Sequence, residues 1–194
     1  RGYRLSQPLT WLDAAEINRA LGTHAGKFVI EVLDLAASTN TVLMQRAADG
    51  ATSGSVLAAE WQTQGRGRRG RVWHATPGAA LTFSLLWRFQ QGAGALSGLS
   101  LAIGIAVVRA LARCAIVDAG LKWPNDVIWR GRKLAGLLIE MQGEVNGPSA
   151  AVIGLGLNCR LPDALRDRID QPVVDLAQIS ERAPDRNQLL ATIL

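Results

Sequence analysis

Cysteine is scarce in this chain, as are histidine and tyrosine. The 194 residues include two cysteines, two histidines and one tyrosine. Cys114 and Cys159 both lie inside apolar segments, which predicts packing as reduced thiols and argues against a disulfide-stapled secreted domain. We expect that no apolar run approaches the length of a membrane span, and the N-terminus lacks a signal-peptide pattern. These absences favour a cytoplasmic protein without a membrane partner.

What the chain has in quantity is apolar residues, at 48%, together with a formal net charge of +5. The apolar fraction is ample for one packed core, so the length predicts one sizeable domain, or one domain plus a remnant. Much of the positive excess falls in a single loop. That concentration favours a local anionic ligand over a surface that binds nucleic acid broadly.

The basic loop, residues 65–71, reads Gly-Arg-Gly-Arg-Arg-Gly-Arg. Its glycines leave backbone N–H groups open to a ligand, and its arginines offer planar cationic forks suited to carboxylate and phosphate. Apolar strand-like runs flank it, which predicts a cationic lid over an anionic ligand. Arg/Gly runs also occur as solvated linkers and as non-specific nucleic-acid patches.

The hydrophobic patterns predict a chain of alternating helices and strands. Helices are expected over residues 13–21, 41–48 and 96–114, with a last one capped at Asp185. In the long helix, Gly98 and Gly104 indicate close packing against a neighbour. Strands are expected over residues 28–33, 55–61, 81–87, 134–141 and 151–159, with two short strands on either side of Pro124.

Small polar residues precede the second of these helices. Ser38 or Thr39 can cap its first turn, which is the commoner role, or Ser38-Thr39-Asn40 can bind a polar ligand atom. Trp73, beyond the basic loop, would either cover the core or stack on a base. No acid or nucleophile stands near His74 in the sequence, so we expect no role for it.

A second charged segment, Lys122-Trp123-Pro124-Asn125-Asp126, interrupts two apolar runs. The proline should make a rigid kink from which Asn125 and Asp126 project, although such a turn is also common without function. Asp126 could hold Mg²⁺ or receive an amine. Lys133 enters a buried strand, either as a snorkelling surface residue or as a working charge.

Glycines mark one face of the strand over residues 151–159. By the two-residue period, Val152, Gly154, Gly156 and Asn158 share that face. Glycine weakens a strand unless something must approach its backbone. Either a flat ligand or a closely packed helix would explain the pair.

Five segments together resemble the biotin–protein ligase family in order and spacing. They are residues 38–40 (Ser-Thr-Asn), 65–70 (Gly-Arg-Gly-Arg-Arg-Gly), 122–126 (Lys-Trp-Pro-Asn-Asp), 133–136 (Lys-Leu-Ala-Gly) and 154–158 (Gly-Leu-Gly-Leu-Asn). The resemblance is close over residues 29–159. It implies an α+β fold similar to class II aminoacyl-tRNA synthetases: a mixed, mostly antiparallel sheet with helices mainly on one face.

The resemblance also implies two half-reactions. Biotin and MgATP give biotinyl-5′-AMP, and the biotinyl group then passes to a lysine of a biotin carrier protein such as that of acetyl-CoA carboxylase. The catalytic residues would be Arg68, Lys133 and Asp126, the last contacting either Mg²⁺ or the incoming lysine amine. Biotin would be bound by Ser38, Thr39, Asn40, Gln62, Arg66, Gly67, Arg68, Lys133, Gly136, Gly154 and Gly156. ATP and the adenylate would be bound by Arg66, Arg68, Arg71, Trp73, Asn125, Asp126, Lys133 and Asn158.

By the same resemblance, residues 1–5 would be the remnant of an upstream winged-helix domain, as in bifunctional ligase/repressors. Residues 6–194 would be the catalytic domain, and the small SH3-like domain of relatives is absent from this sequence. A homodimer formed through sheet edges is open, and no specific nucleic-acid binding is expected from these residues. The alternatives are a lipoate–protein ligase and a nucleic-acid-binding module that uses the basic loop.

Overall fold

A seven-stranded sheet organises the computed structural model, which describes residues 9–143 and 147–194. The strand order is β1-β2-β3-β7-β6-β5-β4. β1 and β2 are parallel, and the other neighbouring pairs are antiparallel, which confirms the predicted mixed, mostly antiparallel sheet. The strands are β1 (Val29–Ala36), β2 (Ser55–Gln62), β3 (Ala80–Phe89), β4 (Ala119–Lys122), β5 (Asp126–Trp129), β6 (Arg132–Gly143) and β7 (Ser149–Asn158).

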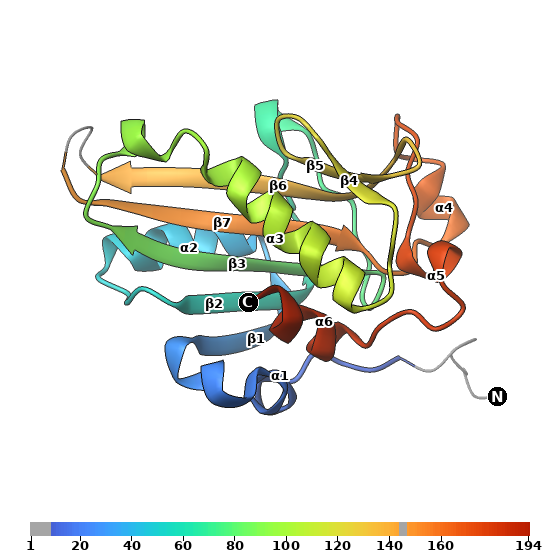
Figure 1. Cartoon of the computed structure of the whole chain (residues 1–194), viewed down its shortest axis with the longest axis horizontal. Coiled ribbons are helices and arrows are strands. Elements are labelled where there is room, and N and C mark those ends of the chain that lie inside the picture. The colour runs from blue at the N-terminus through green and yellow to red at the C-terminus, as the bar shows by residue number, and fades with distance from the viewer. Residues whose placement is uncertain (1–8, 144–146) are drawn as a thin grey trace.

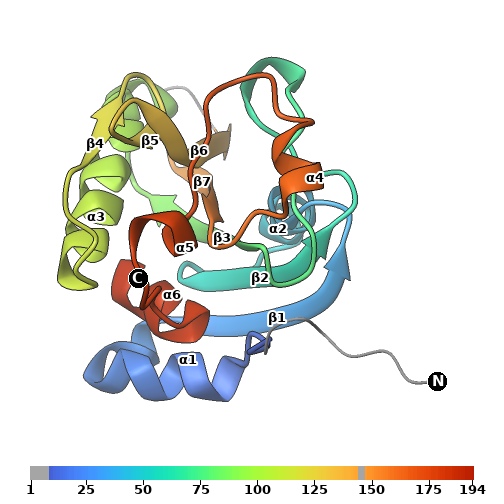
Figure 2. The ribbon, with the colours of Figure 1, turned by 90° about the vertical axis from the view of Figure 1, so that its right-hand side faces the viewer.

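Helices cover both faces of this sheet, unequally. Figure 1 shows α3 lying across one face with α6 below it and α1 at the β1 edge, and the turned view in Figure 2 places α2 on the opposite face. The α-helices are α1 (Ala14–Leu21), α2 (Thr39–Ala48), α3 (Leu99–Arg113), α4 (Asp163–Arg166), α5 (Leu176–Ile179) and α6 (Arg186–Ile193). Short 3₁₀ turns are η1 (Gly22–Lys27), η2 (Arg68–Gly70) and η3 (Ala93–Leu96).

The strand alternation divides the apolar residues between two cores. On β7, Leu155 and Leu157 join the larger cluster with α1, α3 and α6, whereas Val152 joins the smaller cluster beneath α2. On β3, Leu81 faces the larger cluster and Leu86 the smaller one. The predicted two faces of β7 are therefore confirmed, and its glycine face lies on the α2 side of the sheet.

Side-chain caps begin the two outer helices, and the one at Asp185 confirms the sequence prediction. The carboxylate of Asp13 accepts from the backbone N–H of Glu16 at the start of α1, and Gly22 ends that helix with a φ of 56°. Asp185 caps α6 by accepting from the N–H groups of Asn187 and Gln188. Such caps satisfy amide groups that the first turn leaves unpaired.

The long helix differs from expectation in two respects. It begins at Leu99 after the separate turn η3, rather than at Leu96. Gly104 packs closely, because a Cβ there would lie 2.9 Å from the side chain of Leu121, but a Cβ on Gly98 would meet nothing within 4 Å. The prediction of close packing at Gly98 was therefore wrong: the residue lies at the exposed entrance to the helix.

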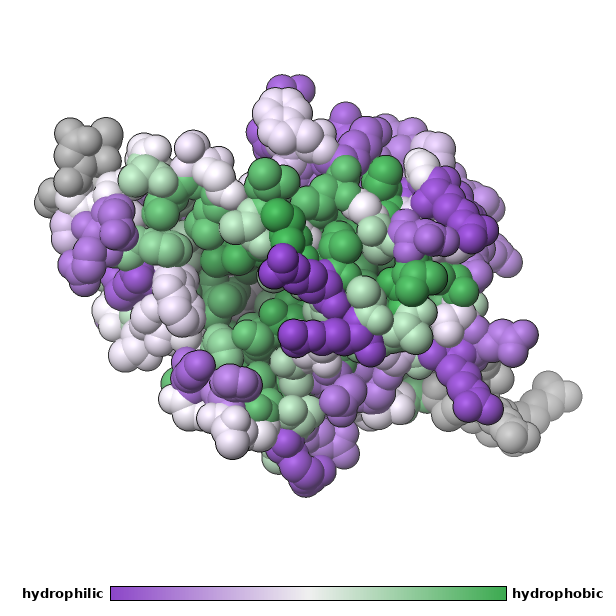
Figure 3. Space-filling model, in the orientation of Figure 1, coloured by the Kyte–Doolittle hydropathy of each residue, from purple (hydrophilic) through white to green (hydrophobic). Residues whose placement is uncertain are grey.

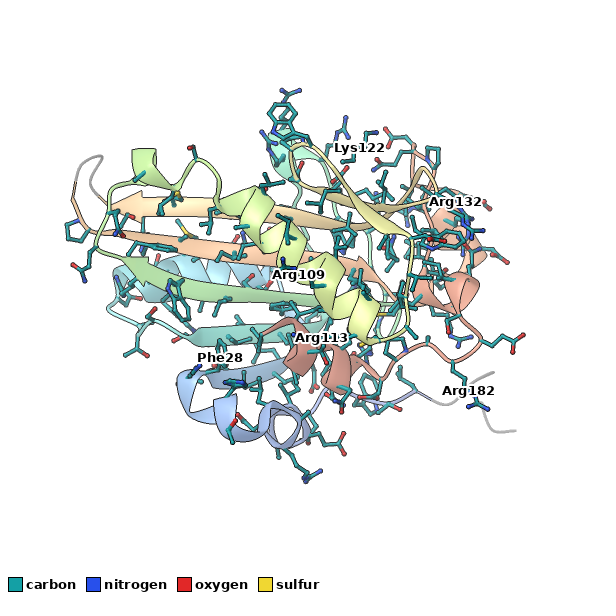
Figure 4. The ribbon with its side chains drawn as sticks, viewed as in Figure 1. Phe28, Arg109, Arg113, Lys122, Arg132 and Arg182 are labelled. Carbon is teal, nitrogen blue, oxygen red and sulfur yellow. The ribbon has the colours of Figure 1, made fainter. Side chains whose placement is uncertain are left out.

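The helical stretch Gly94–Arg113 is also more apolar than the sequence pattern predicts. By length and composition it could cross a membrane, with a mean hydropathy of 1.9 over its most apolar window, which corrects our statement that no run approaches a span. A core helix passes the same test, but only 22% of this window is buried in the fold, at Gly104, Val107, Ala110 and Leu111. Figure 3 shows apolar side chains gathered around α3, and Figure 4 shows Arg109 and Arg113 extending from it.

Both cysteines are unpaired thiols, as predicted. Burial raises the pKa of the Cys159 thiol to about 12, whereas Cys114 is half-buried. Since the thiolate is the reactive form, Cys159 should resist iodoacetamide at pH 8 in the native protein. Mass spectrometry of the peptides should find alkylation at Cys114 alone, and at both residues after denaturation. Equal native reactivity would contradict this environment for Cys159.

Candidate active site

The floor of the candidate site is the glycine face of β7. A Cβ on Gly154 would lie 2.2 Å from the Oδ1 atom of Asn40, and one on Gly156 would lie 2.4 Å from the indole ring of Trp73. Side chains from α2 and from the end of the basic loop thus lie directly against this backbone. The expected close packing of a helix holds at Gly154, where Asn40 of α2 lies, whereas the neighbour of Gly156 is the ring of Trp73. The alternative of a flat ligand on this face stays a prediction.

The N-terminus of α2 presents its small polar residues to the same space. Ser38 occupies the cap position, but its side chain makes no capping hydrogen bond. The first amide is satisfied from outside the helix, because the backbone N–H of Thr39 donates to Oε1 of Gln62 over 2.7 Å. The predicted capping role of Ser38 or Thr39 is therefore taken by Gln62 of β2, and the Ser38 hydroxyl lines the pocket.

The basic loop folds back on itself as a narrow turn. Arg66 and Val72 form an isolated antiparallel bridge, and the N–H of Trp73 donates to the carbonyl of Gly65 over 2.8 Å. Arg69 at the tip has a φ of 57°. The guanidinium of Arg66 donates to Glu140 over 3.1 Å and to the hydroxyl of Thr41 over 3.0 Å. One arginine of the loop is therefore anchored to β6 through a carboxylate.

A β-bulge aims Lys133 into the site. In the β5–β6 pairing, Val127 faces Ala135 whereas Ile128 faces Lys133, so Leu134 is an extra residue on β6. Such a bulge breaks the two-residue alternation, which re-aims neighbouring side chains. Leu134 and Ala135 are both fully buried. The Lys133 side chain then crosses Gly136, where a Cβ would lie 3.2 Å from Nζ.

Lys133 is partnered by Asp126. Its Nζ atom lies 2.8 Å from Oδ1 of Asp126, and the two side chains are 16% and 19% exposed. The same Nζ lies 5.9 Å from the centroid of the Trp73 ring, within reach of a cation–π contact. Lys133 is therefore neither a snorkelling surface residue nor an isolated charge, and it sits beside the one carboxylate that the sequence marks out.

Two asparagines of the predicted site hold the framework together. The side-chain amide of Asn125 donates to the carbonyl of Leu137 over 2.7 Å. That of Asn158, which is 3% exposed, donates to the carbonyl of Val174 over 3.1 Å. These bonds join β6 and the segment that follows β7 to the pocket wall, so at least part of each asparagine's hydrogen-bonding capacity is structural.

The segment after β7 forms a wall that the sequence did not reveal. Arg168, Ile169, Asp170, Gln171 and Val173 line the pocket. Figure 2 shows this segment rising beside the one that carries η2. The backbone N–H of Lys133 holds this segment by donating to the carbonyl of Pro172 over 2.8 Å, and a half-buried Arg166 forms an ion pair of 2.8 Å with the buried Asp175. No motif marks these residues, because their placement depends on contacts with β6.

All of these elements surround one cavity of about 710 Å³. This volume falls within the range of small-molecule sites. The predicted site residues all line it: Ser38, Thr39, Asn40, Gln62, Arg66, Gly67, Arg68, Arg71, Trp73, Asn125, Asp126, Lys133, Gly136, Gly154, Gly156 and Asn158. His74, for which we expected no role, also lines it. Cations from the basic loop and from β6 therefore converge on a single pocket.

A glycine floor, a cationic loop and a paired lysine thus border the same pocket. The family model described as "Biotin/lipoate A/B protein ligase family" matches residues 32–158. The chain belongs to this family.

Curated relatives and solved structures agree with the assignment. The bifunctional ligase/repressor BirA of Salmonella typhimurium is 38% identical over 194 residues, covering 100% of this chain and 59% of the relative. The biotin–[acetyl-CoA-carboxylase] ligase of Mycobacterium tuberculosis is 38% identical over 196 residues, covering 98% and 70%. The biotin protein ligase of Aquifex aeolicus in complex with biotin and ATP superimposes with a TM-score of 0.69 at 29% identity, covering 84% of this chain and 66% of that one. This chain thus spans just under three-fifths of the first relative's length.

Proposed function

We propose that this chain carries an ATP-dependent biotin–protein ligase activity. It would form biotinyl-5′-AMP and transfer the biotinyl group to a lysine of a biotin carrier protein of the acetyl-CoA carboxylase type. The observation that carries the proposal is the convergence of Lys133 and the arginines of the basic loop on one cavity with a glycine floor. The names of the relatives support biotin as the acid.

The first step joins two anions, which is the physical problem that the pocket addresses. A carboxylate oxygen of biotin attacks the α-phosphorus of ATP, the bond to the bridging oxygen breaks, and pyrophosphate leaves. Lys133 and Arg68 would offset the repulsion between carboxylate and phosphate and stabilise charge in the in-line displacement. Trp73 and Asn125 would border the adenylate, and the polar residues 38–40 with Gln62 would border the bicyclic head of biotin.

The second step needs an amine nucleophile from the carrier. The acceptor ammonium first gives up a proton to water, the free amine nitrogen attacks the acyl carbon, AMP leaves with the bonding electrons, and a second N–H proton passes to solvent. Asp126 would receive the ammonium form of the acceptor, because it already binds an ammonium group, that of Lys133, over 2.8 Å. Magnesium would be held by Asp126 only in part: among the described residues no cluster of three or more His, Cys, Asp or Glu side chains could hold a metal. Phosphate oxygens of ATP would supply the remaining ligands.

The wider assignments follow the family. The fold is proposed to be of the class II aminoacyl-tRNA synthetase type, with residues 6–194 as the catalytic domain and the parent protein cytoplasmic. Residues 1–5, assigned by resemblance to an upstream winged-helix domain, lie outside the described residues. A homodimer, with the carrier protein as a second macromolecular partner, also remains a proposal.

Calorimetry with biotin and with lipoate, each with and without ATP, tests the proposal against its nearest rival. We expect biotin to bind without ATP and lipoate to give no heat, because the pocket offers polar groups for a ureido bicycle that a linear acid cannot satisfy. Tighter binding of lipoate would favour the lipoate–protein ligase alternative. Salt-sensitive binding of arbitrary oligonucleotides without a response to biotin would favour the nucleic-acid module.

The basic loop should become protected when the pocket fills. Biotin plus ATP is expected to slow trypsin cleavage between Arg66 and Arg71, since arginines bound to anions and a closed loop are poor protease substrates. Cleavage at the exposed Arg182 provides an internal control that should not change. Equal cleavage rates at saturating ligand would show that the loop does not close over the pocket.

A further inference from the structure

A chain of side-chain hydrogen bonds runs beneath the pocket from β6 to β2. Asn40 donates through Nδ2 to Oε2 of Glu140 over 2.9 Å. Ser84 Oγ lies 2.6 Å from Oδ1 of Asn40 and 2.8 Å from Oγ1 of Thr39. The chain ends where the Thr39 N–H donates to Gln62. Ser84 and Asn40 are 0% and 4% exposed, so bulk water has little access to these hydrogen bonds.

Counting protons fixes the direction of each bond. Both hydrogens of Asn40 Nδ2 have acceptors, the carbonyl of Leu138 at 3.0 Å and the carboxylate of Glu140, so its Oδ1 must accept. Ser84 has one hydroxyl proton, which therefore goes to Asn40. The 2.8 Å contact between Ser84 and Thr39 then needs the proton of Thr39. Thr39 has one proton for two oxygens, Ser84 Oγ at 2.8 Å and Gln62 Oε1 at 3.2 Å. We assign it to the shorter contact, because two oxygens without a proton between them repel more strongly at 2.8 Å than at 3.2 Å.

We infer that Ser84, Asn40 and Glu140 are positioning residues that determine specificity by holding the Thr39 hydroxyl as an acceptor only. Toward the pocket, Thr39 Oγ1 then offers a lone pair and no proton. Thr39 Oγ1 would accept a hydrogen bond from a ligand N–H, and it would repel a ligand oxygen in the position of that N–H. The inference rests on the proposed function for the identity of that group, which is a ureido N–H of biotin.

Two carbamate analogues of biotin, each with one ureido N–H replaced by oxygen, test the inference by calorimetry. For the wild-type chain, the analogue that places oxygen at Thr39 should bind about 100-fold more weakly than biotin, because two lone pairs would meet in a buried site. In Ser84→Ala the Thr39 proton is released from Ser84, and the ligand oxygen then competes for it with Oε1 of Gln62, which lies 3.2 Å from Thr39 Oγ1. The ratio of the two affinities should then fall to a few-fold, roughly that of one ordinary hydrogen bond.

Thr82→Val is the matched control. Thr82 lies two residues from Ser84 on β3, is 1% exposed, and donates to the carbonyl of Ala59 outside the chain of bonds. Loss of the Thr82 hydroxyl should leave the ratio of the two affinities at the wild-type value.

Glu140→Gln perturbs the hydrogen-bonded series at its β6 end, since glutamine can present either an oxygen or an N–H to Asn40. This variant should lower the ratio of the two affinities to about 10-fold. Glu140→Gln also weakens the contact between Arg66 and residue 140. Any resulting loss of affinity applies equally to biotin and to the analogue, so it cancels in their ratio.

A wild-type ratio in Ser84→Ala would overturn the inference. If that variant does not fold, a wild-type ratio in Glu140→Gln would do the same. Wild-type chain that binds biotin but discriminates against neither analogue would also overturn it while leaving the proposed function intact. Absence of biotin binding to the wild-type chain would count against the proposed function itself.

Discussion

Replacing Lys133 with alanine is expected to slow pyrophosphate release from biotin and ATP by about two orders of magnitude. The ammonium group lies in the pocket beside Asp126, where a carboxylate and a phosphate would have to meet. Removing one such preorganised charge typically costs on the order of 3 kcal/mol of transition-state stabilisation. A pyrophosphate-coupled assay at saturating biotin and ATP measures the effect on the chemical step.

Arg132→Ala provides the matched control for this variant. Arg132 precedes Lys133 on the same strand, but its guanidinium lies 5.4 Å from the centroid of the Trp129 ring and it does not line the cavity. Figure 4 shows Arg132 labelled at the α4 side of the molecule. The control should retain wild-type turnover. Retained turnover in Lys133→Ala, with circular dichroism unchanged in both variants, would refute the assigned role of Lys133.

Replacing Arg186 with alanine is expected to destabilise the fold by about 3–5 kcal/mol, because it leaves a buried carboxylate without its partner. Arg186 at the start of α6 forms a two-pronged ion pair with Glu60 of β2, with N–O distances of 2.8 and 2.9 Å. The Arg186 and Glu60 side chains are 8% and 2% exposed. For a domain of this size, such a loss should lower the melting temperature by roughly 10 °C.

Two further variants separate the ion pair from general surface effects. Arg182→Ala removes an exposed arginine near α6 and should leave the melting temperature unchanged. The double variant Glu60→Met/Arg186→Leu removes both buried charges, so it should recover much of the lost stability. A single variant as stable as the wild type would show that the pair does not fasten α6 to the sheet.

The sequence predicted the elements that depend on local chemistry. The helix cap at Asp185 and the two faces of β7 follow from short-range pattern alone, and the structure has both. The five motif segments also predicted a common site. Their convergence follows from the strand order, which places β7 between β3 and β6.

What sequence could not predict depends on pairing between distant segments. The bulge at Leu134 exists only in the register of β6 against β5, and without it Lys133 and Gly136 would lie on opposite faces. Ser84 is a single serine in an apolar strand, and its contacts with Asn40 and Thr39 arise only when α2 packs across β3. The Arg66–Glu140 pair is equally non-local: the sequence predicts Arg66 as a ligand-binding cation, and the structure also pairs it with a carboxylate of β6.

The most direct test of the account is whether the protein makes the mixed anhydride itself. The chain is incubated with biotin, ATP and Mg²⁺, quenched in acid, and analysed by mass spectrometry for biotinyl-5′-AMP. We predict an adenylate signal with biotin that is absent with lipoate and falls about 100-fold in Lys133→Ala. An adenylate formed from lipoate but not from biotin, or one formed undiminished by Lys133→Ala, would contradict the account.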